Sequence, residues 1–363
     1  MSNTPPYFSI IIPTYNRERV IIDTLHSIQC QTFKSWECII IDDGSTDNSI
    51  QKIFKFIKDD QRFILKERDS LPKGPTKCRN IGLSFAKANK IIFFDSDDLF
   101  LPWALQGRFD YIEINPNSDL TLFQSCSFYN KKRISLRANP NIDNYLNSIL
   151  SFVPTFGTPN PVWKKDFIKK IGQWNENISV WDDPELHGRA MVNKARIEWG
   201  DTTPDCLIRC DNLDEFKLTN SKTALKNYET ILAAYLELYK TLNTVQKSLF
   251  KKNIISQVYR HAPSLERRQI LSISEWLRKN NFIGHKEYFA FKKLTLNYLK
   301  FQKIPIVRRY FHNRLLSNVI PNSEIKYSDD EIIQTFSDEF HNELSKNKFP
   351  FLEKINLNLN AAN

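Results

Sequence analysis

A cluster of acidic side chains follows the apolar run Ile91–Phe94. Asp95, Ser96, Asp97 and Asp98 place three carboxylates within four residues. Such a cluster at the end of a buried strand is costly unless a cation neutralises it, because like charges repel and burial disfavours the charged form. Mg²⁺ or Mn²⁺, bound by one or two carboxylates and phosphate oxygens, is one solution. A solvated acidic turn or a helix N-cap is the alternative.

A second acidic turn lies at residues 42–47, after an earlier apolar run. Gly44 permits a tight turn, and Thr46 or Asp47 can cap a following helix. A carboxylate held just after a strand can also accept a hydrogen bond from the N–H of a nucleobase. We therefore expect Asp43 to contact a ligand, and Thr46 and Asp47 to be capping residues.

The elements that must position these turns alternate between strand and helix. Short β-branched and aromatic runs predict buried strands at Phe8–Ile12, Glu37–Ile41, Phe63–Leu65, Ile91–Phe94 and Leu120–Phe123. Helical spacing lies between them, around residues 20–28 and 50–57. This order predicts an α/β fold with a mostly parallel sheet flanked by helices. Ligands bind such sheets beyond the carboxyl ends of the strands, so the polar turns are expected at one edge.

Together these motifs resemble family 2 of the inverting glycosyltransferases, whose Rossmann-like nucleotide-binding fold is called GT-A. The matching segments occur in the family's order and spacing at Ile11–Arg17, Gln31–Phe33, Trp36–Glu37, Ile41–Asp47, Arg79–Gly82 and Phe94–Asp98. Each segment alone is weak evidence for this family, but the whole series in this order is specific to it. The resemblance thins after residue 125 and ends near residue 200.

The resemblance implies a binding site for the nucleotide of a sugar donor. It implies that Pro13, Thr14 and Tyr15 hold the nucleobase and ribose, with Tyr15 stacked on the base. Asp43 would then bind the N3–H of a uracil-type base, and Arg79 would lie beneath the nucleotide.

The resemblance also implies a metal site in the donor loop. Asp95 and Asp97 correspond to the family's DxD pair, with Ser96 between them. Asp97 would be the Mn²⁺ or Mg²⁺ ligand, and Asp95 would lie nearer the ribose and the metal.

An inverting transferase needs a general base, because the acceptor hydroxyl loses its proton as it attacks the anomeric carbon. The resemblance assigns this role to Asp183, and Asp182 replaces the family's usual Glu. The residue types also allow Asp183 to be a helix N-cap, with Pro184 at the first helical position. Both roles are compatible, since a cap holds its carboxylate rigidly.

Three further residues are assigned to the acceptor side. Trp174 lies in segment 172–176, which resembles the family's acceptor loop, and Asp182 precedes the expected base. His187 follows on the same predicted helix and is a candidate for contact with donor phosphate or acceptor. A structural role is the alternative for His187.

Composition and the pattern at the N-terminus limit the classes of protein to which the chain can belong. The chain is 41% hydrophobic and 25% charged, as in ordinary globular proteins. Its apolar runs are far shorter than the roughly 18 residues of a membrane span. The N-terminus lacks a secretory pattern, and the six cysteines are scattered. We therefore expect a cytoplasmic protein with reduced thiols.

The charge divides the chain into two regions. The formal net charge is +10. Positive and negative side chains cancel in residues 1–220, whereas the excess of positive charge lies in residues 260–314. We expect a GT-A catalytic domain at 1–220 and a basic, helical region at 221–363 for acceptor, membrane-surface or oligomer contacts. An apolar stripe beside cationic side chains lies at 306–319. This pattern is typical of a helix that binds peripherally to the inner face of an anionic membrane, and equally of an ordinary amphipathic helix. No nucleic-acid module is recognised.

The resemblance implies transfer of a sugar from a nucleotide-sugar, with UDP expected, to a glycan or lipid-linked glycan in bacterial surface polysaccharide synthesis. The chain lacks the Gln-x-x-Arg-Trp motif of processive members, so we expect one sugar per acceptor. Two other classes stay open. A sugar nucleotidyltransferase would share the sheet and metal, although no Gly-rich phosphate loop follows the first strand. The other is a non-catalytic nucleotide-binding or scaffold protein.

Overall fold

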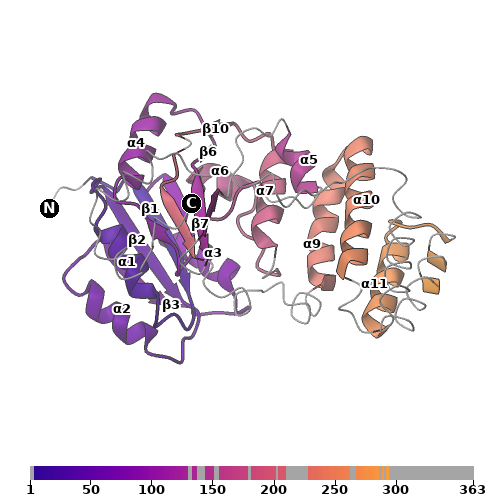
Figure 1. The fold of residues 1–363 in the computed structure, drawn as a ribbon, viewed down its shortest axis with the longest axis horizontal. Coiled ribbons are helices and arrows are strands. Elements are labelled where there is room, and N and C mark those ends of the chain that lie inside the picture. Colours follow the sequence, from indigo (N-terminus) through magenta and orange to yellow (C-terminus); the bar gives the residue numbers. More distant parts are fainter. Residues whose placement is uncertain are drawn as a thin grey trace. The chain divides into compact units, whose positions relative to one another are not determined.

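The computed structural model describes residues 4–129, 133–136, 144–150, 155–178, 181–201, 203–209, 228–261, 267–285, 288–289 and 292–293. Contacts divide the chain into two compact units (Figure 1). The first holds the described residues of 4–143 and 154–213, and the second those of 144–153 and 214–328. Residues 144–150 therefore group with the described helical residues after 213, whereas the expected catalytic domain, 1–220, included them.

A seven-stranded sheet forms the centre of the first unit. Its strands are β1 (Phe8–Thr14), β2 (Trp36–Asp42), β3 (Phe63–Glu67), β4 (Lys90–Phe93), β6 (Leu120–Leu122), β9 (Pro161–Lys164) and β10 (Ile197–Trp199). They run in the order β10-β6-β9-β4-β1-β2-β3. Only β9 is antiparallel to its neighbours among these strands. The predicted, mostly parallel sheet is confirmed, but β9 and β10 were not predicted.

Helices cover the sheet and connect its parallel strands. Those of the first unit are α1 (Ile21–Gln29), α2 (Ser49–Ile57), α3 (Pro75–Phe85), α4 (Ala104–Ile114), α6 (Lys165–Lys170) and α7 (Asp182–Val192). α3 begins with a proline after Gly74, whose φ of 146° favours glycine. It also packs closely on β1, because a Cβ built on Gly82 would lie 2.3 Å from Ile11 Cγ2.

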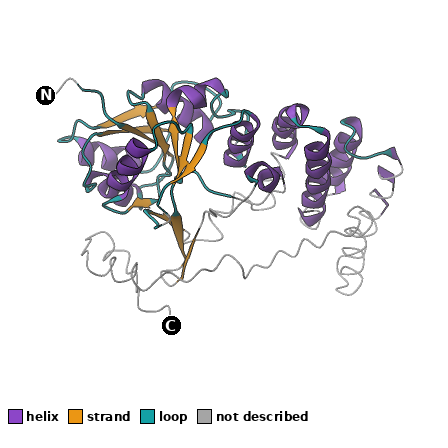
Figure 2. Ribbon diagram, turned by 90° about the horizontal axis from the view of Figure 1, so that it is seen from above, coloured by secondary structure: helices purple, strands orange, loops and turns teal. Residues whose placement is uncertain are grey.

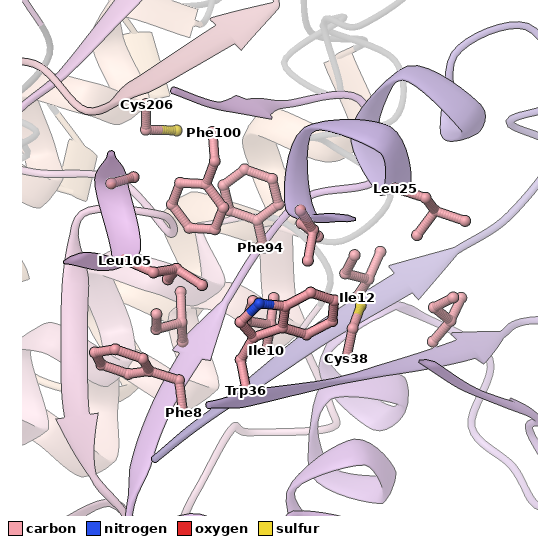
Figure 3. Close-up of a cluster of buried hydrophobic side chains, with 14 of the residues drawn as sticks. Phe8, Ile10, Ile12, Leu25, Trp36, Cys38, Phe94, Phe100, Leu105 and Cys206 are labelled. Atoms are coloured by element: carbon pink, nitrogen blue, oxygen red, sulfur yellow. The ribbon is translucent and has the colours of Figure 1, made fainter. Parts of the chain in front are cut away.

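The core under the site is built from β-branched and aromatic side chains. Trp36, Ile10 and Ile12 lie together in it, with Leu25 from α1 (Figure 3). Phe94 stacks on Phe100 with ring centres 4.0 Å apart, and both side chains are fully buried. Because Phe94 immediately precedes the acidic cluster, this packing fixes the start of that loop.

A second, four-stranded sheet was not predicted. It consists of β5 (Leu99–Phe100), β11 (Cys206–Arg209), β7 (Ser125–Tyr129) and β8 (Arg133–Leu136), in that order. Strands of two to five residues are too short to show a clear alternation in the sequence. The pairing of β5 with β11 brings Arg209 beside the acidic loop.

The second unit is helical in its described part (Figure 2). Its helices are α5 (Tyr145–Leu150), α9 (Tyr228–Thr241), α10 (Thr244–His261) and α11 (Arg267–Lys279). The helical character expected after residue 220 is found in α9, α10 and α11, whereas the stripe at 306–319 and most of 285–314 lie outside the described residues. None of the described helices is both long and apolar enough to cross a membrane.

Candidate active site

The polar turns converge because the strands before them are parallel neighbours. Thr14 on β1 pairs with Asp42 on β2, and Ile11 pairs with Phe93 on β4. The loops after these strands therefore leave the sheet at the same edge, as predicted. Pro13 and Thr14 complete β1, and Tyr15 follows them with 41% of its surface exposed.

The two carboxylates of the turn after β2 have different partners. Asp42 Oδ2 accepts hydrogen bonds from the N–H groups of Gly44 and Ser45, each at 2.8 Å. Gly44 has a φ of 87°, which a residue with a side chain rarely adopts. Asp43 Oδ1 instead accepts a hydrogen bond of 2.5 Å from Arg68 Nε. Asp42 thus builds the turn, whereas the buried Asp43 pairs with a side chain from the end of β3.

Helix α1 and Gln31, two residues after its end, hold the acidic loop and its continuation in place. Thr24 Oγ1 donates to the carbonyl of Ser96 at 3.1 Å, and Ser27 Oγ accepts from the N–H of Phe100. The buried amide of Gln31 donates to the carbonyl of Leu101. The motif residue Gln31 therefore has a structural role, since it satisfies backbone groups that burial would otherwise leave unpaired.

The three acidic side chains of this loop differ in environment. Asp95 is the most open, with 38% of its side chain exposed. Burial, and then the charge of Asp95, raises the pKa of Asp97 to about 6. Burial and both neighbouring carboxylates raise the pKa of Asp98 far above its usual range, while its Oδ1 accepts from the N–H of Arg209 at 3.1 Å. Asp98 is thus internal, whereas Asp95 and Asp97 remain for a ligand.

Asp95 and Asp97 fit a divalent cation that is completed by a ligand. Among the described residues, no group of three or more His, Cys, Asp or Glu side chains forms a ready-made metal cage. Mg²⁺ usually needs only one or two carboxylates, with phosphate oxygens and water supplying the rest. A cation would also relieve the repulsion that raises the pKa of Asp97.

Arg79 joins the acidic loop to the start of α7. Its Nη2 donates to Asp95 Oδ1 at 2.8 Å, and its Nη1 donates to Asp182 Oδ2 at 2.7 Å. The side chain is 6% exposed, and its guanidinium carbon lies 4.4 Å from the ring centre of Trp174. Although the sequence analysis expected Arg79 beneath a nucleotide, both of its terminal nitrogens bind carboxylates here.

The start of α7 carries two neighbouring carboxylates in unlike environments. The helix begins at Asp182, and Trp181 occupies the cap position with a φ of 60°. Asp183 is therefore not the N-cap, and Pro184 is not the first helical residue. Burial, and then the charge of Asp182, raises the pKa of Asp183 to about 7. Asp182 is held by Arg79, whereas Asp183 is suited to accept a proton near neutral pH.

Trp174 belongs to a turn that α3 and α7 hold from two sides. The Asn80 side chain donates to the Trp174 carbonyl at 2.9 Å and accepts from its N–H at 3.0 Å. Arg189 binds Glu185 and donates to the carbonyl groups of residues 171 and 173. Trp174 is only 3% exposed, and its ring packs against the Arg79 guanidinium. Direct contact of Trp174 with an acceptor remains a prediction.

His187 lies among aromatic side chains. It is 2% exposed, and its ring centre is 4.1 Å from that of Phe156 and 5.9 Å from that of Trp163. Burial lowers the pKa of His187 to about 3, so the ring is neutral. This environment favours the structural alternative for His187 and provides no support for contact with a substrate.

Three arginines beside the predicted site were missed in the sequence analysis. Arg17 Nε lies 3.8 Å from Asp97 Oδ2, Arg68 binds Asp43, and Arg209 Nε donates to the carbonyl of Asp97 at 3.1 Å. Arg17 and Arg68 follow β1 and β3, whose carboxyl ends lie at the ligand edge. Their positions just after strands were a usable signal, whereas Arg209 depends on the unpredicted second sheet.

Comparisons with known proteins agree with this architecture. Residues 9–171 match the family model described as "Glycosyl transferase family 2". The chain is 32% identical over 167 residues to the poly(ribitol-phosphate) beta-glucosyltransferase of Bacillus spizizenii, which is 45% of this chain and 26% of the relative. It is 38% identical over 93 residues to the UDP-Glc:alpha-D-GlcNAc-diphosphoundecaprenol beta-1,3-glucosyltransferase of Escherichia coli, 26% of this chain and 36% of the relative. The chain thus matches less than half of each relative's length.

The fold is shared with the crystal structure of Staphylococcus aureus TarS. The superposition has a TM-score of 0.58 at 19% identity and covers 84% of this chain and 55% of TarS. At that identity the likeness concerns the fold, and it confirms the expected GT-A architecture.

Proposed function

This chain belongs to glycosyl transferase family 2 through residues 9–171, and from that premise we propose that it transfers a sugar from a uridine diphosphate sugar to a hydroxyl of a glycan or lipid-linked glycan. The reaction would be a single displacement with inversion. A bond forms between the acceptor oxygen and the anomeric carbon, the bond from that carbon to the diphosphate oxygen breaks, and the acceptor's proton passes to a carboxylate.

The donor would lie along the edge formed by the loops after β1, β2 and β4. Tyr15 is exposed and able to stack on a base, and Asp43 supplies an acceptor for a base N–H. Asp97 and Asp95 would hold Mn²⁺ or Mg²⁺ against the diphosphate. Such a cation neutralises the charge that develops on the departing diphosphate.

Asp183 would be the general base. A carboxylate with its pKa raised to about 7 is a far better proton acceptor than an ordinary aspartate, and about half of it is ionised at pH 7. Asp182 would fix the position of Asp183 relative to the acidic loop, because Arg79 binds Asp182 and Asp95 at the same time.

The Arg79 bridge is the observation that carries the proposal. Through one buried guanidinium it ties the loop expected to hold the leaving group to Asp182, the neighbour of the expected general base. An inverting displacement needs these two parts at a fixed separation, since misplacement of reacting groups by about 1 Å can cost two orders of magnitude in rate.

The choice of donor and acceptor draws on the relatives. TarS has been crystallised with UDP, and the name of the Escherichia coli relative specifies UDP-Glc and a diphosphoundecaprenol-linked acceptor. We infer a role in bacterial surface polysaccharide synthesis, with one sugar added per acceptor. A lipid-linked acceptor would bring the enzyme to the cytoplasmic face of a membrane, and the helical region would take part in acceptor binding.

Two variants separate donor binding from catalysis. We expect UDP to raise the melting temperature of the full chain only with Mn²⁺ or Mg²⁺, and Asp97→Ala to abolish that shift. Asp183→Asn should keep the shift but slow the release of UDP from a UDP-sugar, with water as acceptor, by about 10²–10⁴-fold.

The control is Asp110→Asn, on the exposed face of α4, which should change neither measurement. A UDP shift that is independent of metal and of Asp97 would argue against the metal site. Unchanged UDP release in Asp183→Asn would remove Asp183 from the mechanism.

A further inference from the structure

The end of α11 and residues 288–293 carry aromatic and cationic side chains that the proposed function does not use. The guanidinium carbon of Arg278 lies 5.5 Å from the ring centre of Tyr288, and Lys292 Nζ lies 5.7 Å from the same point. Phe289 packs edge to face on Tyr288, with ring centres 5.4 Å apart. These four side chains, here called the Tyr288 cluster, all belong to the second unit.

The two aromatic rings of the Tyr288 cluster differ in exposure. Tyr288 is 8% exposed, whereas 62% of the surface of Phe289 is exposed. Residues 288, 289, 292 and 293 are helical, so Phe289 and Lys293, which are four residues apart, lie on the same face. Lys293 is exposed as well. The cluster thus buries one ring and presents the other to solvent beside a cation.

The charge around these rings is strongly positive. Residues 267–293 contain seven Lys or Arg and two Glu. One of these acids, Glu275, lies 3.6 Å from Arg278 and offsets part of its charge. Lys279 and Lys293 are exposed. The excess of positive charge therefore lies at the surface that also exposes Phe289.

Cations and an exposed aromatic ring together fit the surface of an anionic membrane. Lys and Arg keep their charged ends at lipid phosphates while their stems cover apolar surface. An aromatic ring beside them enters the boundary between headgroups and acyl chains. A soluble polymer of phosphate groups would be bound by the cations alone and would leave Phe289 in water. The exposed ring therefore favours a membrane over a soluble polyanion.

We propose that the Tyr288 cluster, together with Lys293, binds the surface of a membrane that contains anionic lipids. Phe289 enters the headgroup boundary, and Arg278, Lys292 and Lys293 contact lipid phosphates. The Tyr288 ring attracts the cations of Arg278 and Lys292 and so gathers them beside Phe289. This contact goes beyond the proposed function, because it requires neither donor nor acceptor.

The test is co-sedimentation of the full chain with vesicles of phosphatidylcholine, alone or with about one third phosphatidylglycerol. No nucleotide, metal or glycan is added. We expect binding only to the vesicles that contain phosphatidylglycerol, and weaker binding as the salt concentration rises. The double variant Lys292→Gln, Lys293→Gln should lower the partition coefficient about 5–25-fold, at about fivefold for each cation removed.

The exposed ring provides a second readout. Phe289→Ser should lower the partition coefficient into the same vesicles by about 5–50-fold, because the variant has no apolar ring to transfer out of water. Phe289→Trp should bind as well as the wild type, since tryptophan is favoured at the boundary between membrane and water. A surface that binds only through charge would not distinguish these two variants.

Two control variants lie in the first unit. Ile114→Ser removes an apolar side chain that is 79% exposed and follows the acidic Glu113. The double variant Lys169→Gln, Lys170→Gln removes two adjacent exposed cations at the end of α6. Both should sediment with vesicles as the wild type does. Because every substituted side chain is at least partly exposed, each variant should melt close to the temperature of the wild type.

The outcomes separate the membrane contact from the proposed function. Equal sedimentation with both kinds of vesicle, or none with either, would overturn the contact. Losses in the control variants as large as those at residues 289, 292 and 293 would do the same. If the lysine variant loses binding but Phe289→Ser does not, and the full chain binds inorganic polyphosphate, the partner is a soluble polyanion instead. The proposed function is tested separately, by stabilisation with UDP, and stands or falls independently of these results.

Discussion

At the scale of the residue, the site shows how two identical side chains acquire different chemistry. Asp182 and Asp183 are neighbours at the start of α7, yet Arg79 binds only Asp182. Asp183 is left in a buried position beside a negative charge, which raises its pKa to about 7. Asp183 is therefore the better proton acceptor, and Asp182, which Arg79 binds, is better suited to hold position.

The pH dependence of activity follows from the sign of this shift. Asp183 must be ionised to accept a proton, so kcat/KM should fall about tenfold for each pH unit below its raised pKa and level off above it. Asp182→Asn removes a charge that raises the pKa of Asp183, so the acid limb should move to lower pH. UDP release from a UDP-sugar measured from about pH 5.5 to 8.5 tests both statements.

Protonation of Asp97, whose pKa is also raised, must be separated from that of Asp183. Saturating Mn²⁺ competes with the proton at Asp97, so the acid limb that persists under saturation belongs to Asp183. A flat profile under saturation, or a shift to higher pH in Asp182→Asn, would contradict the assigned base.

At the scale of the element, α3 combines three tasks within four residues, 79–82. Arg79 bridges the two groups of carboxylates, and Asn80 pairs with both backbone groups of Trp174. Gly82 lets the helix lie directly on β1, where the side chain of Ile11 fills the space. The Arg-Asn-x-Gly motif is thus explained by contacts, because the glycine sets the depth at which the other two side chains act.

Substitution at Gly82 tests this packing. In Gly82→Ala the new methyl group would lie 2.3 Å from Ile11 Cγ2, so the helix must shift. We expect the free energy of unfolding to fall by about 1–3 kcal/mol in urea titrations. Donor-dependent activity should fall as well, because Arg79 moves with the helix.

Gly107→Ala is the control, since Gly107 is exposed in α4 and a Cβ there meets nothing within 4 Å. It should raise the free energy of unfolding by about 0.5–1 kcal/mol, through the higher helix propensity of alanine. Equal stability of the two variants would contradict the close contact between α3 and β1.

At the scale of the whole molecule, the chain builds its second unit from two separate segments. α5 lies within the catalytic half of the sequence but groups with α10 and the other helices after residue 213. Ile149 and Leu150 at the end of α5 are buried. Removal of the C-terminal region would therefore leave an apolar helix without its partners.

Truncation after residue 213 tests this arrangement. We expect the shortened chain to bind an apolar dye such as ANS more strongly than the full chain does, because the buried face of α5 becomes exposed. Replacing Ile149 and Leu150 by serine in the shortened chain should reverse most of that gain. Dye binding equal to that of the full chain would mean that α5 does not depend on the helical unit.

The sequence by itself determined the parallel strands, the edge at which the polar turns meet and the acidic loop. These follow from local patterns: continuous apolar runs predict buried strands, and neighbouring parallel strands put their carboxyl ends together. The resemblance carried by the motif series predicted the GT-A fold, which the structural comparison confirms.

Only the tertiary structure decided which partner each of these side chains has. Arg79 meets Asp182 across 103 residues of sequence, and Arg209 meets Asp98 across 111, so neither pair leaves a local signal. The neutral, aromatic environment of His187 likewise leaves no local signal. The physical reason is that burial and charge pairing, which set proton affinity and hydrogen-bonding capacity, depend on neighbours that folding brings from distant parts of the chain.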